Sequence, residues 1–135
     1  MKSIAVIGLG QFGSQVAISL SQKGFDILAI DSEEDVANEY KDMVSSVVIL
    51  DSTDEKAMRA ANVDSVDVAV VAIGSNVQSS LLTAALLQRL GIESIYVRAI
   101  EPLQEGILRS MGIQDVVNIE AEMGKQLSSS LASGK

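Results

Sequence analysis

The stretch VIGLGQFGSQ, residues 6–15, decides the fold of this chain. It places Gly8, Gly10 and Gly13 in the spacing G-x-G-x-x-G, directly after a run of apolar residues. In such a motif the first glycine permits a tight turn and the second lets backbone N–H groups approach a pyrophosphate. The third lets the next helix lie close to the strand, and the helix start adds partial positive charge. The motif therefore predicts a nucleotide-binding turn between a strand and a helix.

A carboxylate follows at the offset that this motif requires. Asp31 ends the next predicted strand, about 20 residues beyond the glycines. Its carboxylate is expected to accept hydrogen bonds from ribose hydroxyls, and its charge would repel a 2′-phosphate, which disfavours NADP. Ser32 beside it is a further candidate for nucleotide binding and can also cap the helix that comes next.

Strands and helices alternate along the whole chain. Apolar runs predict six strands, at residues 3–7, 26–30, 47–50, 68–73, 94–98 and 115–119. Capping residues, apolar spacing and glycine stops predict helices over residues 12–23, 33–41, 53–61, 76–90 and 102–112, and from residue 120 onward. This alternation predicts an α/β fold, a Rossmann-like doubly wound parallel sheet in the order 3-2-1-4-5-6. A ligand would bind at the carboxyl ends of its strands.

Composition limits the class of protein. The chain has 135 residues, which indicates one domain, and 47% of them are hydrophobic but only 3% aromatic, as in a Val/Ile/Leu/Ala core. Its apolar runs fall far short of the ~18 residues that a membrane span needs, and its start does not look like a signal peptide. A cytosolic location is expected.

Absent residues exclude several kinds of chemistry. The sequence contains no cysteine and no histidine, so disulfides, thiol nucleophiles and the commonest general base are excluded. The formal net charge is −8, from 10 Lys and Arg against 18 Asp and Glu. A protein so acidic, with no basic cluster, is not expected to bind nucleic acid.

Two more strand ends carry candidate ligand groups. Asp51, with Ser52 beside it, ends the third strand where an adenine would lie, but a turn or helix cap with Ser52 and Thr53 explains Asp51 equally well. Arg98 ends the fifth strand and could reach phosphates across the point where the strand order reverses. An ion pair with Glu101 is an equally good interpretation of Arg98.

Three segments together resemble a known family. They are GLGQFG at residues 8–13, VVAIGSNVQ at residues 70–78 and NIEAEMG at residues 118–124. They resemble the N-terminal RCK domain, also called KTN or TrkA-N, of the KtrA/TrkA-type proteins that gate potassium channels and transporters. The resemblance implies binding of an adenine nucleotide (NAD, NADH, ADP or ATP), and it adds as candidate binding residues Gln11, Phe12, Ile73, Gly74 and Ser75.

The resemblance also implies partners and a domain layout. Residues 1–119 would be the nucleotide-binding domain, and residues 120–135 a helix that crosses to or dimerises with a second copy. The smaller C-terminal RCK lobe has no counterpart in the sequence. The family forms dimers and an octameric ring that docks on a membrane pore subunit, which implies a peripheral location at the inner face of the cell membrane.

The last predicted helix supports self-association on its own residues. Met123, Leu127 and Leu131 recur at i, i+4 and i+8, which makes an apolar stripe with no later element to cover it. The stripe is expected to pack on a second copy; the alternative is that it folds back on its own sheet.

Two positions depart from the family pattern. The family usually has arginine where this chain has Gln11, and a neutral amide cannot neutralise a γ-phosphate, so only a small preference between ATP and ADP is expected. The family's Pro-Glu pair is here Ile119-Glu120. The resemblance implies that Glu120 helps to hold Mg²⁺ or Ca²⁺ beside the nucleotide. The alternative is a residue that only favours the helix dipole.

These observations favour a regulator that senses a nucleotide over an enzyme. The main alternative is an NAD-dependent oxidoreductase or its cofactor-binding half, which would need an acid/base group. Tyr96 is expected in the core, and Tyr40 on a surface helix remote from the point where the strand order reverses. A methyltransferase and a purely structural module are weaker alternatives, because neither explains the third glycine and the phosphate turn together.

Overall fold

The sheet is parallel throughout, and its strand order is β3-β2-β1-β4-β5-β6. This is seen in a computed structural model that describes residues 2–134. The strands are β1 Ser3–Ile7, β2 Asp26–Asp31, β3 Ser46–Ile49, β4 Val68–Val71, β5 Ser94–Arg98 and β6 Asp115–Val117. The order confirms the predicted doubly wound, Rossmann-like α/β fold.

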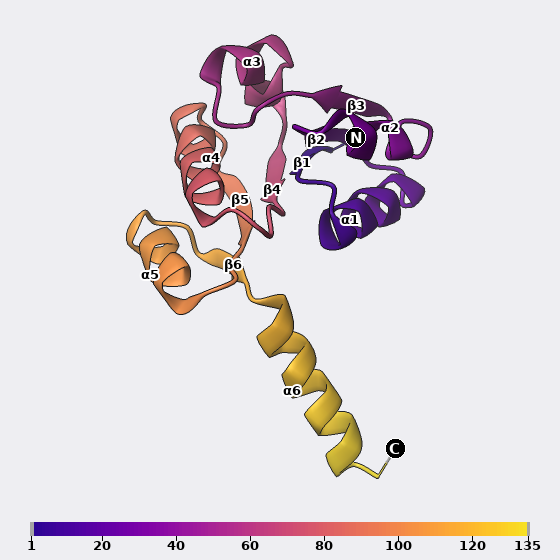
Figure 1. Cartoon of the computed structure of the whole chain (residues 1–135), viewed down its shortest axis with the longest axis vertical. Helices are drawn as coiled ribbons and strands as arrows, with labels where there is room; N and C mark the ends of the chain where they lie inside the picture. Colours follow the sequence, from indigo (N-terminus) through magenta and orange to yellow (C-terminus); the bar gives the residue numbers. More distant parts are fainter. Residues whose placement is uncertain (1, 135) are drawn as a thin grey trace.

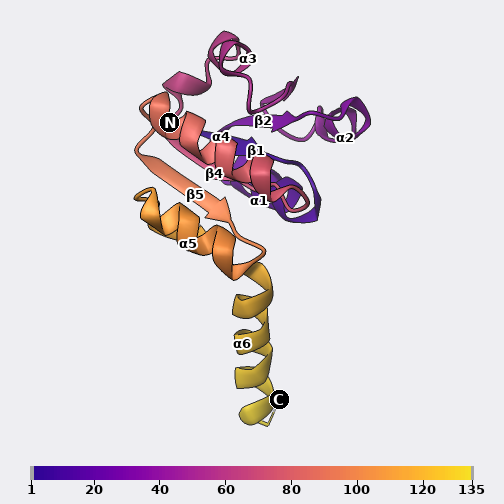
Figure 2. The same ribbon diagram turned by 60° about the vertical axis from the view of Figure 1, so that its left-hand side comes forward.

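Helices lie on both sides of the sheet (Figures 1 and 2). They are α1 Gln11–Gln22, α2 Glu34–Tyr40, α3 Glu55–Ala60, α4 Val77–Arg89, α5 Pro102–Ser110 and α6 Ile119–Ala132, with a short 3₁₀ turn, Val63–Ser65, after α3. α1 and α2 pack on β1, β2 and β3, whereas α4 and α5 pack on β4, β5 and β6. Because each parallel crossover is right-handed, the helices change sides where the strand order reverses.

The two faces of the sheet form two separate apolar clusters. On the α4 side, Ala5 and Ile7 of β1 pack with residues of β4, α4 and β5. On the α1 side, Ile4 and Val6 of the same strand pack with Ala17 of α1 and with β2. Helices cover both faces of β1, and for this reason every residue of the strand after Ser3 is apolar.

Several element ends differ from the prediction. α2 begins after Glu33, and the N–H of Glu33 donates to Asp31 (2.9 Å), so the prediction that Ser32 caps this helix is wrong. β6 stops at Val117, two residues early, because Asn118 accepts a hydrogen bond from the N–H of Ala121 (2.9 Å) and caps α6.

The α1 side of the sheet is open over β4 and β5. Tyr96 of β5 is 41% exposed there, so the prediction that it belongs to the core is wrong. Together with Val68 and Val70 of β4, and Phe25 next to α1, it lines a shallow apolar hollow. The hollow exists because α1 covers β1 and β2 and does not reach β5.

α6 points away from the rest of the molecule (Figures 1 and 2). None of its described residues is buried, and Met123, Leu127 and Leu131 are 55%, 61% and 65% exposed. The alternative that this stripe folds back on its own sheet is therefore wrong. No helix within residues 2–134 combines the length and the hydrophobicity that crossing a bilayer would take.

Candidate nucleotide-binding site

One pocket of about 820 Å³ opens at the carboxyl ends of β1, β2 and β4. This is the edge at which doubly wound sheets bind ligands, and the size suits a small-molecule site. Most of the predicted nucleotide-binding residues line it: Gly8, Gly10, Gln11, Asp31, Ser32, Asp51, Ser52, Ile73, Gly74, Ser75 and Arg98. Phe12 and Gly13 do not line it, and both lie in the first turn of α1.

The glycine turn is built by close backbone contacts. Gly8 has φ +96°, a conformation that favours glycine, and its N–H donates to Ile30 O (2.8 Å). A Cβ at Gly13 would collide with the carbonyl oxygen of Gly8. Gly10 differs, because a Cβ there would have no heavy atom within 4 Å. Gly8 and Gly13 thus serve the fold, while Gly10 faces open space.

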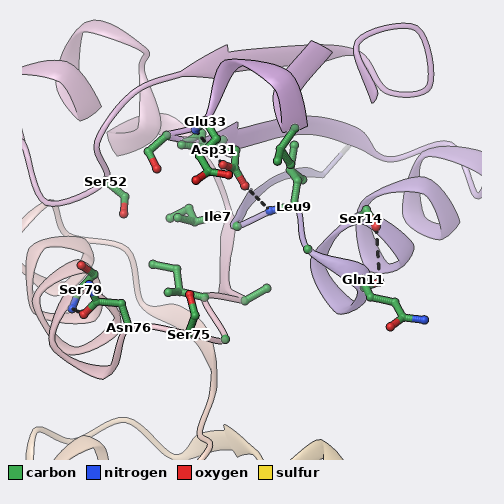
Figure 3. Close-up of a pocket in the computed structure, with 18 of the residues that line it drawn as sticks. Ile7, Leu9, Gln11, Ser14, Asp31, Glu33, Ser52, Ser75, Asn76 and Ser79 are labelled. Atoms are coloured by element: carbon green, nitrogen blue, oxygen red, sulfur yellow. Dashed lines mark hydrogen bonds between the residues drawn. The ribbon is translucent and has the colours of Figure 1, made fainter. Parts of the chain in front are cut away.

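The start of α1 is free of competing groups. Gly10 is the N-cap, no side chain caps the helix, and its first turn carries no acidic residue. The free N–H groups at the N-terminus of a helix attract anions, and phosphates commonly bind there. Gln11 sits at this end with an exposed side chain that is directed away from Asp31 (Figure 3).

Asp31 ties the glycine turn to the end of β2. One carboxylate oxygen accepts from the N–H of Leu9 (2.8 Å) and the other from the N–H of Glu33 (2.9 Å), as the dashed lines of Figure 3 indicate for Leu9. Each oxygen keeps acceptor capacity for a further donor. The same carboxylate thus shapes the turn and presents acceptors to the pocket.

Asp51 forms a turn with Thr53, which is one of the two alternatives that the sequence left open for this residue. It accepts hydrogen bonds from the hydroxyl of Thr53 (2.7 Å) and from its N–H (2.9 Å), and these bonds hold the pKa of Asp51 below its usual value. Ser52 beside it is buried, and its hydroxyl shares a hydrogen bond with Thr83 of α4 (2.7 Å). Both residues still line the pocket.

Arg98 forms an ion pair with a partner other than the one expected. Its Nη2 lies 3.0 Å from Oε2 of Glu120, so the pairing with Glu101 is wrong. The guanidinium lies 6.0 Å from the ring centre of Phe12. It also packs so closely on Gly74 that a Cβ there would be 2.5 Å from Nη1.

Glu120 was expected to hold a divalent cation. Its carboxylate does not line the pocket, and one of its oxygens is engaged by Arg98. Within residues 2–134 no three acidic side chains come together as a cation site. The carboxylate suits Mg²⁺ or Ca²⁺, but this chain supplies it alone, so any further ligands would come from phosphates or a second copy.

Charges in the pocket are unevenly distributed. The carboxylates of Asp31, Glu33, Glu39 and Asp51 line it, and among the described lining residues only Arg98 is cationic. Anionic groups of a ligand are therefore drawn to Arg98 and the start of α1, away from the acidic end near β2 and β3.

Several lining residues were not predicted. Tyr40 is predicted to lie far from the point where the strand order reverses; α2 packs on β2 and β3, and there Tyr40 lines the pocket with Val36 and Glu39. The i, i+4 spacing of Val36 and Tyr40 was a usable signal, since it places both on one helix face. The other missed residues are Ile7, Leu9, Ser14, Gln15, Ile30, Glu33, Leu50, Ala72, Asn76 and Ser79.

A glycine turn at the reversal point of a doubly wound parallel sheet, with a carboxylate at the end of β2, defines a nucleotide-binding domain of the Rossmann class. Within that class, the chain belongs to the TrkA-N domain family, whose model matches residues 4–119. This confirms the family that the three sequence segments resembled.

Curated relatives extend the match over almost the whole chain. The chain is 39% identical to the Ktr system potassium uptake protein C of Bacillus subtilis, over 98% of this chain and 60% of the relative. It is 34% identical to the Ktr system potassium uptake protein A of the same organism, over 97% of this chain and 59% of the relative. The chain thus spans about three fifths of the length of these relatives.

A solved structure shows the same fold. The Kef CTD of Shewanella denitrificans, described in its AMP-bound form, superposes with a TM-score of 0.82. It is 20% identical and covers 99% of this chain and 83% of its own.

Proposed function

We propose that this chain is a regulatory domain that senses an adenine nucleotide and thereby gates a potassium channel or transporter. The observation that carries the proposal is the single pocket in which the glycine turn, Asp31 and Arg98 meet. The match to two potassium uptake proteins over nearly the whole chain supports the role in potassium transport.

The pocket favours a ligand with adenine, ribose and a phosphate chain, such as NAD, NADH, ADP or ATP. The start of α1 and Arg98 attract the phosphates, and Asp31 offers acceptors to ribose hydroxyls. Tyr40 and Val36 supply apolar surface at the other end, where the adenine would lie. Gln11 leaves the terminal phosphate without a second cation, so ATP and ADP should bind with similar affinity.

Regulation fits the chain better than catalysis. The sequence has no histidine or cysteine, and the ionisable groups of the pocket are carboxylates, Tyr40 and Arg98. These groups bind and orient a nucleotide, but they do not pair a nucleophile with a base. An NAD-dependent oxidoreductase, or its cofactor-binding half, is the alternative, and turnover of the bound nucleotide would reveal it.

The proposal includes self-association and a membrane partner. The apolar stripe of α6 and the open hollow over β4 and β5 are both uncovered in one chain, which supports packing between two copies. A dimer, and the family's octameric ring, would then dock on a pore subunit at the cytoplasmic face of the membrane. A divalent cation bridging Glu120 and nucleotide phosphates would belong to that assembly.

Native mass spectrometry of the purified protein tests the proposal. We expect an oligomer that carries an adenine nucleotide, and incubation should leave that nucleotide chemically unchanged. A monomer without nucleotide, together with no calorimetric binding of NAD, ADP or ATP, would contradict the proposal. Conversion of the nucleotide by the protein would instead favour the enzyme.

A further inference from the structure

Arg98 stands between the pocket and α6. It ends β5, lines the pocket beside Gly74, and has a side chain that is only 20% exposed. Glu120 lies in the first turn of α6 and is 66% exposed. The two meet at 3.0 Å, so a pocket residue holds the start of a helix that is otherwise directed away from the sheet.

The contact between Arg98 and Glu120 has no equivalent elsewhere on α6. Apart from bonds to its own cap residues, it is the only ion pair or side-chain hydrogen bond between α6 and the rest of the described chain. No described side chain of α6 is buried. The orientation of α6 within one chain therefore depends on the connection at Asn118 and on this ion pair.

The guanidinium of Arg98 has neighbours on two sides, and one of its hydrogen-bond donors has no partner. Gly74 and the ring of Phe12 confine it, as the close approach at Gly74 and the 6.0 Å separation from Phe12 show. Its Nε is buried and has no hydrogen-bond partner. A buried donor without a partner is unfavourable, so a shift of the guanidinium toward an added acceptor, such as a phosphate oxygen, would be favoured.

A phosphate in the pocket would compete with Glu120. Arg98 is the one cation among the described lining residues, and a phosphate can accept two of its N–H groups at once. The single bond to an exposed carboxylate is the weaker contact. We propose that a phosphate group bound in the pocket takes Arg98 from Glu120 and so releases α6, which couples the occupancy of the pocket to the position of this helix.

This inference rests on the proposed nucleotide site and adds how its occupancy is transmitted. Coupling between two sites is reciprocal, so if bound phosphate weakens the contact between Arg98 and Glu120, that contact weakens phosphate binding by the same factor. Removal of the Glu120 charge should therefore strengthen binding of a nucleotide with phosphates and leave binding of the nucleoside unchanged.

Calorimetry on three proteins tests whether Glu120 weakens the binding of phosphate. The wild type, Glu120→Gln and Glu122→Gln are titrated with ADP and with adenosine in the presence of EDTA, so that no divalent cation bridges Glu120 and the phosphates. Glu122→Gln is the matched control, because it removes the same charge from the same helix turn at a residue that does not contact Arg98. We expect Glu120→Gln to bind ADP about two- to fivefold more tightly than the control does. Adenosine should bind all three proteins equally.

A distance measurement follows α6 itself. The sequence has no cysteine, so Gln22→Cys on α1 and Ser129→Cys on α6 accept two spin labels at defined positions. Diluting labelled protein with excess unlabelled protein restricts the signal to distances within one chain. ADP should shift or broaden the distance distribution of the wild type, and adenosine should not. Glu120→Gln should show the ADP-like distribution without ligand.

The two experiments distinguish failure of the competition for Arg98, failure of the release of α6 and failure of the nucleotide site. Equal ADP affinities of Glu120→Gln and Glu122→Gln would overturn the competition while leaving the nucleotide site intact. Tighter ADP binding by Glu120→Gln with no movement of α6 would mean that Arg98 holds both groups together, and the release would be wrong. Binding of neither ADP nor adenosine to any of the proteins would overturn the proposed nucleotide site and this inference with it.

Discussion

Gly10 and Gly13 belong to one motif, but only Gly13 is packed against another part of the chain. Gly13 lies against the carbonyl of Gly8, so any Cβ there must push the helix and the turn apart. Gly10 has φ −67°, which any residue adopts, and no atom near its Cβ position. We therefore expect the absence of a side chain at Gly10 to matter for a ligand that enters the pocket and not for the fold.

The two alanine variants should separate fold from binding. Gly13→Ala is expected to lower the free energy of unfolding by roughly 1–3 kcal/mol, because it overpacks a backbone contact. Gly10→Ala should keep the melting temperature of the wild type but weaken ADP binding at least about tenfold, or ~1.4 kcal/mol. Thermal denaturation and calorimetry check both. Unchanged ADP affinity in a folded Gly10→Ala protein would show that no ligand approaches this backbone.

Asp31 should decide between NAD and NADP. A 2′-phosphate would lie against its carboxylate, so we expect NADP to bind at least about tenfold more weakly than NAD, or ~1.4 kcal/mol. Asp31→Asn removes the charge and should narrow this gap in calorimetric titrations. Asp26→Asn, at the exposed opposite end of β2, is the control and should preserve the gap. Equal wild-type affinities would place the ribose away from Asp31.

Among the elements, the connection from β5 to α5 depends on a buried amide. Gln104 of α5 is 1% exposed, and its oxygen accepts from the N–H of Ile100 (2.7 Å). Its nitrogen donates to Ser80 Oγ of α4 (3.2 Å) and to the carbonyl of Arg98 (3.3 Å). One side chain thus joins two helices to the strand end that carries Arg98.

Replacing this amide should loosen the connection. Gln104→Leu keeps a similar volume but leaves the Ile100 N–H and the Ser80 hydroxyl without this partner, which should cost about 2 kcal/mol of unfolding free energy. Gln114→Leu is the control, since Gln114 is exposed and its side chain makes no hydrogen bond in the structure. Denaturant unfolding compares the two variants. Equal stability would mean that the Gln104 network does not stabilise the fold.

For the whole molecule, the unusual feature is that two apolar surfaces remain uncovered. α6 follows the last strand, where it could have covered the open side of β4 and β5, yet it points away from the sheet. Exposed apolar area of this kind is unfavourable in water unless another surface covers it. A second copy of the chain would bring an α6 stripe to the hollow of the first, which is the association that we propose.

The stripe should control self-association. Leu127→Glu places a charge in the middle of the stripe and should shift the protein to monomers in sedimentation velocity at micromolar concentration. Ser129→Glu changes a residue on the opposite side of α6 and should leave the association state as it is in the wild type. A wild-type protein that stays monomeric at every concentration would contradict association through α6.

The sequence by itself determined the fold and somewhat less than half of the residues that line the pocket. Glycine spacing, strand-end acids and the alternation of apolar runs are local signals, and in a parallel sheet all strand ends fall on one edge. Gly8, Asp31 and Arg98 could therefore be assigned to one place without coordinates. Those signals also identified the family.

Only the tertiary structure decided which side chains meet across elements. Arg98 pairs with Glu120 and not with Glu101 because α6 starts beside the end of β5, a placement that no periodicity encodes. Tyr96 is exposed, although it lies between the apolar residues Ile95 and Val97, because coverage depends on how far α1 extends over the sheet. Tyr40 reaches the pocket for a similar reason, since α2 packs over β2 and β3 and turns one face to it. Local sequence specifies conformation, whereas burial and pairing follow from packing between distant segments.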